Sequence, residues 1–374
     1  MKIVVLGTAY PLRGGIAHYV GLLGQALARH HTVETITFKR QYPSFLFPGS
    51  SQMEGEEGPH APPAPELIDS INPLNWIRVA RLVRSRTPDL LIFKFWLPFF
   101  GPCFGTIAAL ARRGTSTKVL FICDNVIPHE HRPFDTVCTQ YAFRFVDYFI
   151  VQSKAVEKDL LRFWPRAVYR EVPHPVYTLF GEPVAKEEAR RLLGMDAGRI
   201  LLFFGYVRAY KGLQILLDAL ARTQKEFPVH LLVVGEFYDD EAKYRKQIAE
   251  LHLESAVTVV SEYVPNDRVR LYFSAADAVV LPYRSATQSG IAQIAFNFDR
   301  PVIATDVGGL AETVRNGITG LVIPPDDPAA LARAIASYYH DNLEASFVPH
   351  VREEKKTYSW EALVSAIENL CRQG

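Results

Sequence analysis

Apolar runs of strand length alternate with segments of helical periodicity along almost the whole chain of 374 residues. In the first half these runs are Ile3–Leu6, Val33–Phe38, Leu90–Phe93, Lys118–Ile122 and Tyr148–Val151. After Gly181 the alternation starts again, with runs at Ile200–Phe204, His230–Val234, Val257–Val260, Ala278–Leu281 and Val302–Ala304. Such alternation is typical of parallel sheets that carry helices on both faces. The sequence therefore predicts an α/β protein with two Rossmann-like domains in tandem.

The join between the two domains is expected at Pro173-His174-Pro175. Two prolines in three residues fix backbone torsions and remove two donors from any strand ladder. Near the C-terminus, Trp360, Leu363, Ile367 and Leu370 recur at helical spacing. The predicted parts are an N-terminal domain at 1–174, a C-terminal domain at 175–357 and a helix at 358–374 that returns to the first domain.

The formal net charge is +1, from 41 Lys and Arg against 40 Asp and Glu. A nucleic-acid-binding protein normally shows a strongly basic domain or stripe, so the near-neutral balance argues against that class. The charge is uneven along the chain, because residues 1–174 carry +6 and the remainder carries −5. We therefore expect the two domains to contact different partners.

Three features favour a reduced, cytoplasmic protein. The first apolar run, Ile3–Leu6, is too short for the apolar region of a signal peptide. The apolar window Leu90–Leu110 contains Lys94, two prolines and glycines, so a strand, a turn and a helix fit it better than a membrane span. The four cysteines are scattered without a C-x-x-C pair, which disfavours a zinc site and a disulfide framework.

The first candidate motif, Tyr10 to His18, lies between the first predicted strand and the first predicted helix. Its adjacent Gly14 and Gly15 would let a ligand approach the backbone, and free amides at a helix N-terminus attract anions. The alternative is an ordinary helix-entry turn that contains glycine. The motif does not match G-x-G-x-x-G, so a nicotinamide enzyme is disfavoured.

The second candidate motif, Gly205 to Gly212, leaves the first strand of the second domain and enters a helix. Arg208 and Lys211 would bring two cations to the carboxyl end of a strand, where α/β folds bind their ligands. A pyrophosphate suits two such cations. The alternative is a plain helix entry, but basic residues near a helix start are unfavourable with the helix dipole.

The third candidate motif combines two polar loops that open at the same edge of the second sheet, at 282–290 and 305–312. The side chains of these loops can surround the hydroxyl groups of a sugar or a ribose.

Taken together, the motifs resemble the family 4 retaining glycosyltransferases with the GT-B fold, over nearly the whole chain. The resemblance rests on four segments in the right order: Y-P-x-x-G-G-I from Tyr10, G-x-x-x-x-x-K-G from Gly205, A-A-D-x-x-x-L-P from Ala275 and P-V-I-A-T-D-V-G-G-x-x-E from Pro301. It implies two Rossmann-like domains facing across a cleft. It also implies a UDP- or GDP-linked sugar donor on the C-terminal domain, a glycan or lipid-linked acceptor on the N-terminal domain, and no cofactor or obligatory metal.

Carried over by position, the resemblance assigns Gly14 and Gly15 to the loop that meets the donor phosphates, and Lys211 to the phosphate-binding lysine. The arginine that usually follows the first glycine is Tyr206 here, and Arg208 is expected to serve instead. Arg208 and Lys211 are also expected to stabilise the leaving pyrophosphate. The remaining residues expected at the donor are Glu236, Tyr263 and Val264 at the nucleobase, and Gln288, Ser289, Gly290 and Gln293 at the sugar.

One departure from the family concerns a pair of glutamates, seven residues apart, that the family usually places around the third motif. The matching positions are Thr287 and Ile294, with Gln288 and Gln293 beside them. Glutamine can bind hydroxyl groups but brings no charge to stabilise a cationic transition state. The departure keeps open a catalytically silent protein of this fold that binds nucleotide or glycan.

In the N-terminal domain, the segment Cys123 to His131 follows a predicted buried strand. The family often has a histidine here that reaches the reacting sugar, and Asp124 takes its place. Asp124 is expected to accept a hydrogen bond from a donor hydroxyl or to orient the acceptor, with Asn125 beside it. Asn125, His129 and Glu130 are expected on the acceptor side. His129 or Glu130 is expected to act on the acceptor proton, unless the histidine is a solvated loop residue.

An aromatic cluster at Phe93–Pro102 allows two interpretations. In the first, the cluster forms an apolar acceptor groove or a lipid-facing surface, with nearby cations at Arg78, Arg81, Arg84 and Arg86. In the second, the aromatic residues belong to the core and the arginines lie on a solvated helix face. The leading hypothesis for the whole chain is a retaining sugar transferase, with peripheral association at the inner membrane left open. The alternatives are the silent module and a nucleotide-sugar epimerase of the same architecture.

Overall fold

The computed structural model describes residues 1–43, 51–54, 62–127, 133–195 and 198–372. The chain divides into two compact units. Of the described residues, those up to Pro175 and from Ser359 onward belong to unit 1, and those from Val176 to Tyr358 belong to unit 2. The chain thus passes between the units after Pro175 and after Tyr358, close to the predicted joins.

Unit 1 is built on a seven-stranded sheet in the order β3-β2-β1-β4-β5-β6-β7. All neighbouring strands in it are parallel. The strands are β1 (Lys2–Leu6), β2 (Thr32–Arg40), β3 (Glu66–Asp69), β4 (Leu90–Phe95), β5 (Lys118–Cys123), β6 (Tyr148–Val151) and β7 (Tyr169–Glu171). The short β3 and β7 form the two edges, and neither was among the predicted strands.

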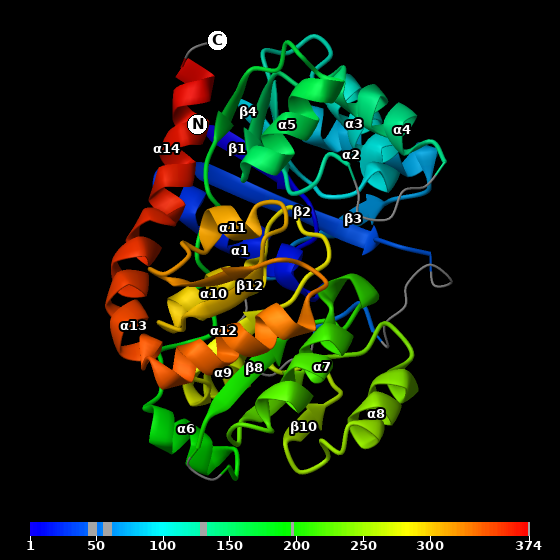
Figure 1. Ribbon diagram of the computed structural model, residues 1–374. Coiled ribbons are helices and arrows are strands. Elements are labelled where there is room, and N and C mark those ends of the chain that lie inside the picture. Colours follow the sequence, from blue (N-terminus) through cyan, green and yellow to red (C-terminus); the bar gives the residue numbers. More distant parts are fainter. Residues whose placement is uncertain (44–50, 55–61, 128–132, 196–197, 373–374) are drawn as a thin grey trace. The chain divides into compact units, whose positions relative to one another are not determined.

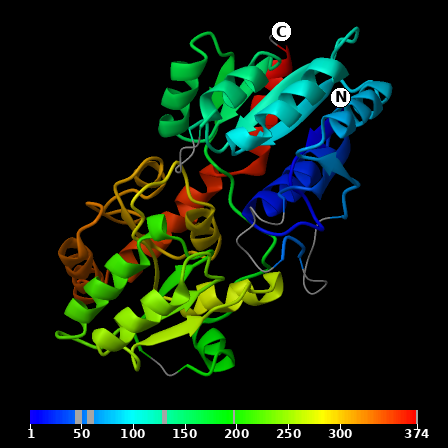
Figure 2. The same ribbon diagram turned by 90° about the vertical axis from the view of Figure 1, so that its right-hand side faces the viewer.

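The helices of unit 1 cover both faces of its sheet. They are α1 (Gly15–Ala28), α2 (Pro73–Ser85), η2 (Pro98–Phe100), α3 (Gly101–Ala111), α4 (Asp135–Phe143), α5 (Lys154–Phe163) and α14 (Trp360–Arg372). Helices α2 to α5 share one buried cluster with residues of β1, β4 and β5. On the opposite face, α1 contacts the C-terminal helix α14, and both views place the C-terminal end of α14 among the elements of unit 1 (Figure 1 and Figure 2).

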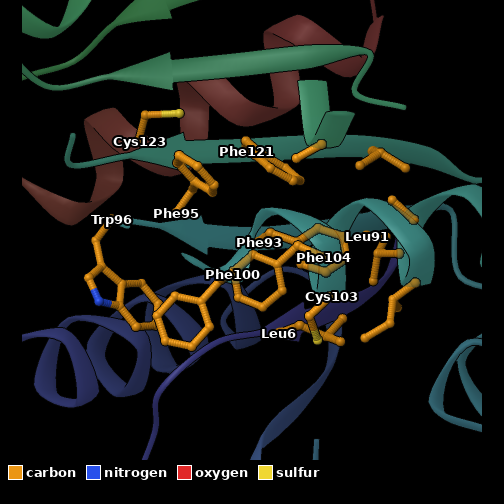
Figure 3. Packing of buried hydrophobic residues seen from close by; sticks show 14 of the residues in the cluster. Leu6, Leu91, Phe93, Phe95, Trp96, Phe100, Cys103, Phe104, Phe121 and Cys123 are labelled. Carbon is orange, nitrogen blue, oxygen red and sulfur yellow. The ribbon is translucent and has the colours of Figure 1, made fainter. Parts of the chain in front are cut away.

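The aromatic segment at the end of β4 belongs to the core of unit 1. Phe93, Phe95 and Phe100 are fully buried and Trp96 is nearly so. Their rings pack against one another and against Phe104, with the Trp96 and Phe100 centroids 4.5 Å apart (Figure 3). The structure therefore supports the core interpretation of this cluster and not the apolar groove.

Unit 2 is built on a six-stranded parallel sheet in the order β10-β9-β8-β11-β12-β13. Its strands are β8 (Ile200–Phe204), β9 (His230–Val234), β10 (Val257–Val260), β11 (Ala278–Leu281), β12 (Val302–Thr305) and β13 (Gly320–Ile323). Its helices are α6 (Lys186–Leu192), η3 (Ala209–Lys211), α7 (Leu213–Thr223), α8 (Glu241–Glu250), α9 (Asn266–Ala275), α10 (Gly290–Asn297), α11 (Leu310–Thr313), α12 (Pro328–His340), α13 (Leu343–Glu354) and η4 (Lys355–Thr357). The prediction of two Rossmann-like α/β units is confirmed.

The aspartate of the A-A-D segment has a structural role in unit 2. The Asp277 carboxylate accepts hydrogen bonds from the Ile200 amide at 2.7 Å and from Arg190 and Lys186 at 2.9 and 2.8 Å. These contacts fix the amino end of β8 to the start of β11. The aspartate therefore sets the register of the strands whose opposite ends carry the candidate site.

No helix among the described residues is long and apolar enough to cross a membrane.

Candidate active site

Three loops of unit 2 meet at the carboxyl ends of the neighbouring strands β8, β11 and β12. The Arg284 amide donates to the Tyr210 carbonyl at 2.7 Å, which ties the loop after β11 to the loop after β8. The Gly309 amide donates to the Thr287 carbonyl at 3.1 Å, which ties the loop after β12 to the same loop after β11. The second and third sequence motifs therefore share one edge of the sheet, where α/β folds bind ligands.

Lys211 ends the short helix η3 and is buried, with 8% of its surface exposed. Its ammonium forms no ion pair or hydrogen bond with any part of the chain that the structure describes, and it lies 5.7 Å from the centre of the Tyr283 ring. Burial and the nearby charge of Arg208 lower the pKa of Lys211 to about 7. A buried ammonium without a carboxylate is unfavourable, so this site is electrostatically incomplete until an anion enters it.

Arg208 precedes η3 and is half-buried, with its guanidinium 4.9 Å from the centre of the Tyr238 ring. This contact between a cation and a ring orients the side chain without neutralising it. Its charge contributes to lowering the pKa of Lys211, so the two cations lie in one electrostatic environment. Two adjacent cations suit a ligand with two anionic centres, such as a diphosphate.

Gly205 leaves open the space in which the Lys211 ammonium lies. Its φ of +95° is a conformation that L side chains rarely adopt. A Cβ at this position would lie 3.1 Å from Nζ of Lys211 and 3.2 Å from Cδ1 of Ile291. The first turn of α10, which contains Ile291, therefore lies beside the buried ammonium.

Helix α10 begins within the candidate site. The Ser289 hydroxyl accepts the Ala292 amide at 3.4 Å and caps the helix, which starts at Gly290. Gln293, in the first turn, is 1% exposed, and its Oε1 has no hydrogen-bond partner among the described residues. A buried amide oxygen without a partner costs free energy, so a ligand donor is expected to satisfy it. Gln288 is half-buried in the preceding loop.

The two positions that match the glutamates of the family are buried. Thr287 is 9% exposed and Ile294 is 6% exposed. Neither carries a carboxylate, and the buried polar side chains near them in the chain are those of Ser289 and Gln293.

The loops expected at the nucleobase carry a stack of tyrosines. The Tyr206 ring stacks on Tyr238 with centroids 4.5 Å apart, and it is 6.5 Å from Tyr263 at an interplanar angle of 30°. The Val207 amide donates to the Glu236 carbonyl at 2.9 Å, which joins the loops after β8 and β9. Val264, next to Tyr263, is buried. Tyr206, in the place of the usual arginine, is thus part of an aromatic surface.

In unit 1 the glycine motif forms the N-terminus of α1. Gly14 caps the helix with a φ of +103°, and the helix begins at the exposed Gly15. The His18 amide donates to the Gly14 carbonyl at 3.1 Å as the first helical bond. The motif therefore opens a helix as predicted, and its role at the donor phosphates stays a prediction.

Asp124 directly follows β5, at the carboxyl edge of the unit 1 sheet. Its Oδ1 accepts a hydrogen bond from Nζ of Lys94 at 2.5 Å. The neighbouring Asn125 side chain donates to the Trp96 carbonyl at 3.4 Å, which holds the loop against the end of β4. His129 and Glu130, expected on the acceptor side, lie outside the described residues.

Two family models match the chain, one over each unit. "Glycosyl transferase 4-like domain" matches residues 14–175, and "Glycosyl transferases group 1" matches residues 198–341. The chain belongs to the family 4 glycosyltransferases. This result confirms the family that the four sequence motifs indicated.

Curated relatives of this glycosyltransferase include enzymes named D-inositol 3-phosphate glycosyltransferase. The protein from Pseudarthrobacter chlorophenolicus is 34% identical over 164 residues, 42% of this chain and 39% of the relative. The protein from Corynebacterium glutamicum (strain R) is 27% identical over 247 residues, 63% of this chain and 59% of the relative. The chain thus matches about half the length of such relatives.

Solved structures share the GT-B fold over the whole chain. Sucrose-phosphate synthase from Thermosynechococcus elongatus superimposes with a TM-score of 0.76 at 23% identity, covering 99% of this chain and 98% of that one. The Anabaena protein Alr3699/HepE, solved in complex with UDP, has a TM-score of 0.72 at 19% identity, covering 100% and 98%. At these identities the likeness concerns the fold.

The sequence motifs of this glycosyltransferase did not reveal two features of its candidate site. Lys94 was considered only as a residue that argues against a membrane span, although it is a lone cation within the apolar run of β4. The stack of Tyr206 and Tyr238 was also missed, although each tyrosine follows a strand of the same sheet within a few residues. A charged residue inside a strand that is otherwise fully apolar is the signal that could have found Lys94.

Proposed function

We propose that the protein is a retaining glycosyltransferase that moves a sugar from a UDP- or GDP-linked donor to a glycan or lipid-linked acceptor. The observation that carries the proposal is Lys211, a buried ammonium without a carboxylate partner in the described chain, beside Arg208. This pair is suited to the diphosphate of a nucleotide sugar. We propose a UDP-linked donor before a GDP-linked one, because the HepE structures contain UDP and UDP-glucose.

In the proposed reaction, the bond between the anomeric carbon and the diphosphate oxygen breaks, and the diphosphate leaves with the electron pair. Arg208 and Lys211 stabilise the negative charge that gathers on it, which is usually the largest contribution to such catalysis. The acceptor hydroxyl oxygen bonds to the anomeric carbon on the same face. Its proton passes to a base, for which His129 and Glu130 are the proposed residues.

Residues at the start of α10 supply the polar contacts of the proposed sugar site. Gln293 offers a buried amide oxygen that a sugar hydroxyl can satisfy, and Ser289 and Gly290 lie at the start of the same helix. Asp124 is the proposed carboxylate of unit 1. Neither cofactor nor metal is part of this proposal, since two protein cations supply the positive charge, and we expect activity to persist after treatment with EDTA.

A panel of nucleotide sugars tests the proposal. Thermal unfolding with UDP, GDP, UDP-glucose and GDP-mannose measures which donor binds, and release of free sugar and nucleotide diphosphate measures donor turnover. We expect stabilisation by one nucleotide series together with slow hydrolysis of its sugar. The absence of a carboxylate at Thr287 and Ile294 favours the silent-module alternative, and stabilisation without hydrolysis or transfer to any acceptor would support that alternative instead.

We further propose that unit 1 associates peripherally with anionic lipid through α2. Arg78, Arg81 and Arg84 are exposed on this helix, and none forms an ion pair within the described residues. Leu74, on the first turn, is 68% exposed. Unpaired arginines beside an exposed apolar residue suit a negatively charged bilayer surface.

Sedimentation with phosphatidylserine vesicles tests this association. We expect binding at low salt that is lost at high salt and in the variant with Arg78, Arg81 and Arg84 changed to Gln. The matched control changes Arg222 and Lys225, exposed cations of unit 2, to Gln. Equal binding by both variants, or none by the wild type at low salt, would exclude the α2 surface.

A further inference from the structure

Lys94 is a charged residue in the middle of the apolar sheet of unit 1. Strand β4 has the sequence Leu-Leu-Ile-Phe-Lys-Phe, and all six residues are buried. Lys94 itself is 1% exposed. Side chains alternate along a strand, so Lys94 points away from the face on which Phe93 and Phe95 join the core, toward helix α1.

The ammonium of Lys94 is fully engaged by three neighbours from three different elements. Nζ donates to Oδ1 of Asp124 at 2.5 Å and to Oε1 of Gln152 at 3.1 Å, and it lies 3.4 Å from the centre of the Tyr19 ring. Gln152 in turn donates its amide to the Tyr19 hydroxyl at 3.0 Å. These contacts join β4 to the loops after β5 and β6 and to helix α1, so the position of the ammonium is fixed from every side.

The titratable side chains of His174 and Cys123, near Lys94 and Asp124, are neutral. The pKa of His174 is lowered to about 4, by burial and by the charge of Lys94. The pKa of the Cys123 thiol is raised, chiefly by burial. Burial lowers the pKa of Lys94 while Asp124 raises it. The contact between Lys94 and Asp124 therefore lies beside a neutral imidazole and a neutral thiol, which do not compete as charged partners.

The pair reaches the surface only through its carboxylate. The Asp124 side chain is 13% exposed, against 1% for Lys94. A buried ion pair often contributes no more stability than apolar residues of similar size, so stability alone gives little reason for a lysine in this strand. A hydrogen bond from a fixed ammonium beneath it does, however, orient a carboxylate at the carboxyl edge of the sheet.

We propose that Lys94 is a positioning residue that holds Asp124 as an oriented hydrogen-bond acceptor for a sugar hydroxyl. The inference rests on the proposed function and assigns a role to a residue that no motif of the chain marks. It also accounts for the departure at Asp124. A neutral histidine in that place would leave the Lys94 ammonium without its carboxylate. The lysine in β4 and the aspartate after β5 are therefore expected to occur as a pair.

Kinetics of Lys94→Met, Asp124→Asn and the double variant test the proposal, with hydrolysis of the donor sugar as the readout. We expect Lys94→Met to lower kcat at least tenfold with little change in KM for the donor, because the hydrogen bond that orients Asp124 is lost. The double variant should lose no more activity than Asp124→Asn, because Lys94 acts through Asp124. Lys118→Met, at the opposite end of β5, is the matched control.

A second measurement is independent of turnover. In protein labelled with carbon-13 at aspartate carboxyl groups, the Asp124 signal is identified by its loss in Asp124→Asn. We expect the chemical shift of this signal to change in Lys94→Met, because the hydrogen bond from Nζ of Lys94 to Oδ1 is lost, whereas Lys118→Met leaves it unchanged. The fluorescence of the four tryptophans, which all lie in unit 1, shows whether unit 1 of each variant is folded.

The outcomes separate this inference from the function on which it rests. An active wild type with an unchanged kcat in Lys94→Met would overturn the role of Lys94 alone. A wild type that turns over no donor would overturn the proposed function, and the carbon-13 spectra would then decide whether Lys94 positions Asp124. An unchanged Asp124 signal in Lys94→Met would overturn the inference in either case.

Discussion

Each unit of the protein buries one lysine at its candidate site, and the two lysines are in opposite electrostatic states. Lys94 of unit 1 is paired with Asp124 at 2.5 Å. Lys211 of unit 2 has no carboxylate partner in the described chain, and Arg208 adds a second positive charge to its surroundings. The first site is balanced by the protein itself, whereas the second requires an anion from outside.

The comparison shows that burial alone does not mark a ligand site. Burial lowers the pKa of both lysines. The difference is the second contribution, since Asp124 opposes the effect at Lys94 and Arg208 increases it at Lys211. A buried charge that the fold leaves uncompensated is therefore the more direct sign of a charged ligand.

The largest expected effect concerns the paired lysine. Asp124→Asn leaves the buried Lys94 ammonium without its carboxylate, and we expect the free energy of unfolding of unit 1 to fall by about 3 to 5 kcal/mol. The double variant with Lys94→Met should recover most of this loss. Denaturant unfolding followed by tryptophan fluorescence measures it in unit 1 specifically, because Trp76, Trp96, Trp164 and Trp360 all lie there. Equal losses in the single and double variants would mean that the ion pair is not the cause.

The unpaired lysine should show the reverse pattern. We expect Lys211→Met to lower donor turnover by roughly a hundred- to a thousandfold. One group placed to stabilise the charge of the leaving diphosphate lowers the free energy of the transition state by about 3 to 4 kcal/mol. The thermal stability of the free protein should stay the same or rise, since a buried unpaired ammonium is removed. Lys225→Met, at an exposed lysine of unit 2, is the control. Normal turnover in Lys211→Met would remove the diphosphate assignment.

The smallest expected effect is a pH dependence of donor binding. With a pKa of about 7, Lys211 is charged below pH 7 in the free protein and increasingly neutral above it. A diphosphate binds the charged form, so the affinity for the donor should be constant below pH 7 and fall by up to about tenfold per pH unit above it.

Calorimetry with UDP-glucose, or with the donor that binds, between about pH 6 and about pH 8.5 measures this effect, and buffers of different ionisation heat report the proton uptake above pH 7. Lys94→Met should keep the same pH dependence of binding, and Lys211→Met should lose it. If the wild type bound its donor equally well across this range, the lysine would not titrate as the structure indicates.

Strand prediction from the sequence succeeded for every central strand and failed at three of the four sheet edges. The nine central strands are covered by neighbouring strands and by helices, and each has an apolar run in the sequence. The missed strands β3, β7 and β13 are edge strands, whereas the edge strand β10 (Val257–Val260) has an apolar run and was predicted. A residue in an edge strand such as Tyr169–Glu171 is only partly covered, so its sequence does not need to be apolar.

The candidate site divides in the same way. Some site residues lie in segments that directly follow strands, namely Gly14, Arg208, Lys211 and the start of α10. The carboxyl end of a strand can be located from its apolar run in the sequence, so these residues could be predicted. The relation between Lys94 and Asp124 joins residues 30 positions apart on neighbouring strands. No local pattern specifies which side chain across a sheet meets which, because that depends on strand order and register.

The sequence by itself determined the two α/β units, the family and the strand ends at which cations gather, because periodicity, glycine and charge act over short stretches of chain. The tertiary structure decided which charges are compensated. It brought β4 beside β5 so that Lys94 meets Asp124, and it enclosed Lys211 without bringing a carboxylate to it in the described chain. The energy of a buried charge depends on every neighbour that the fold assembles around it, and those neighbours come from distant parts of the sequence.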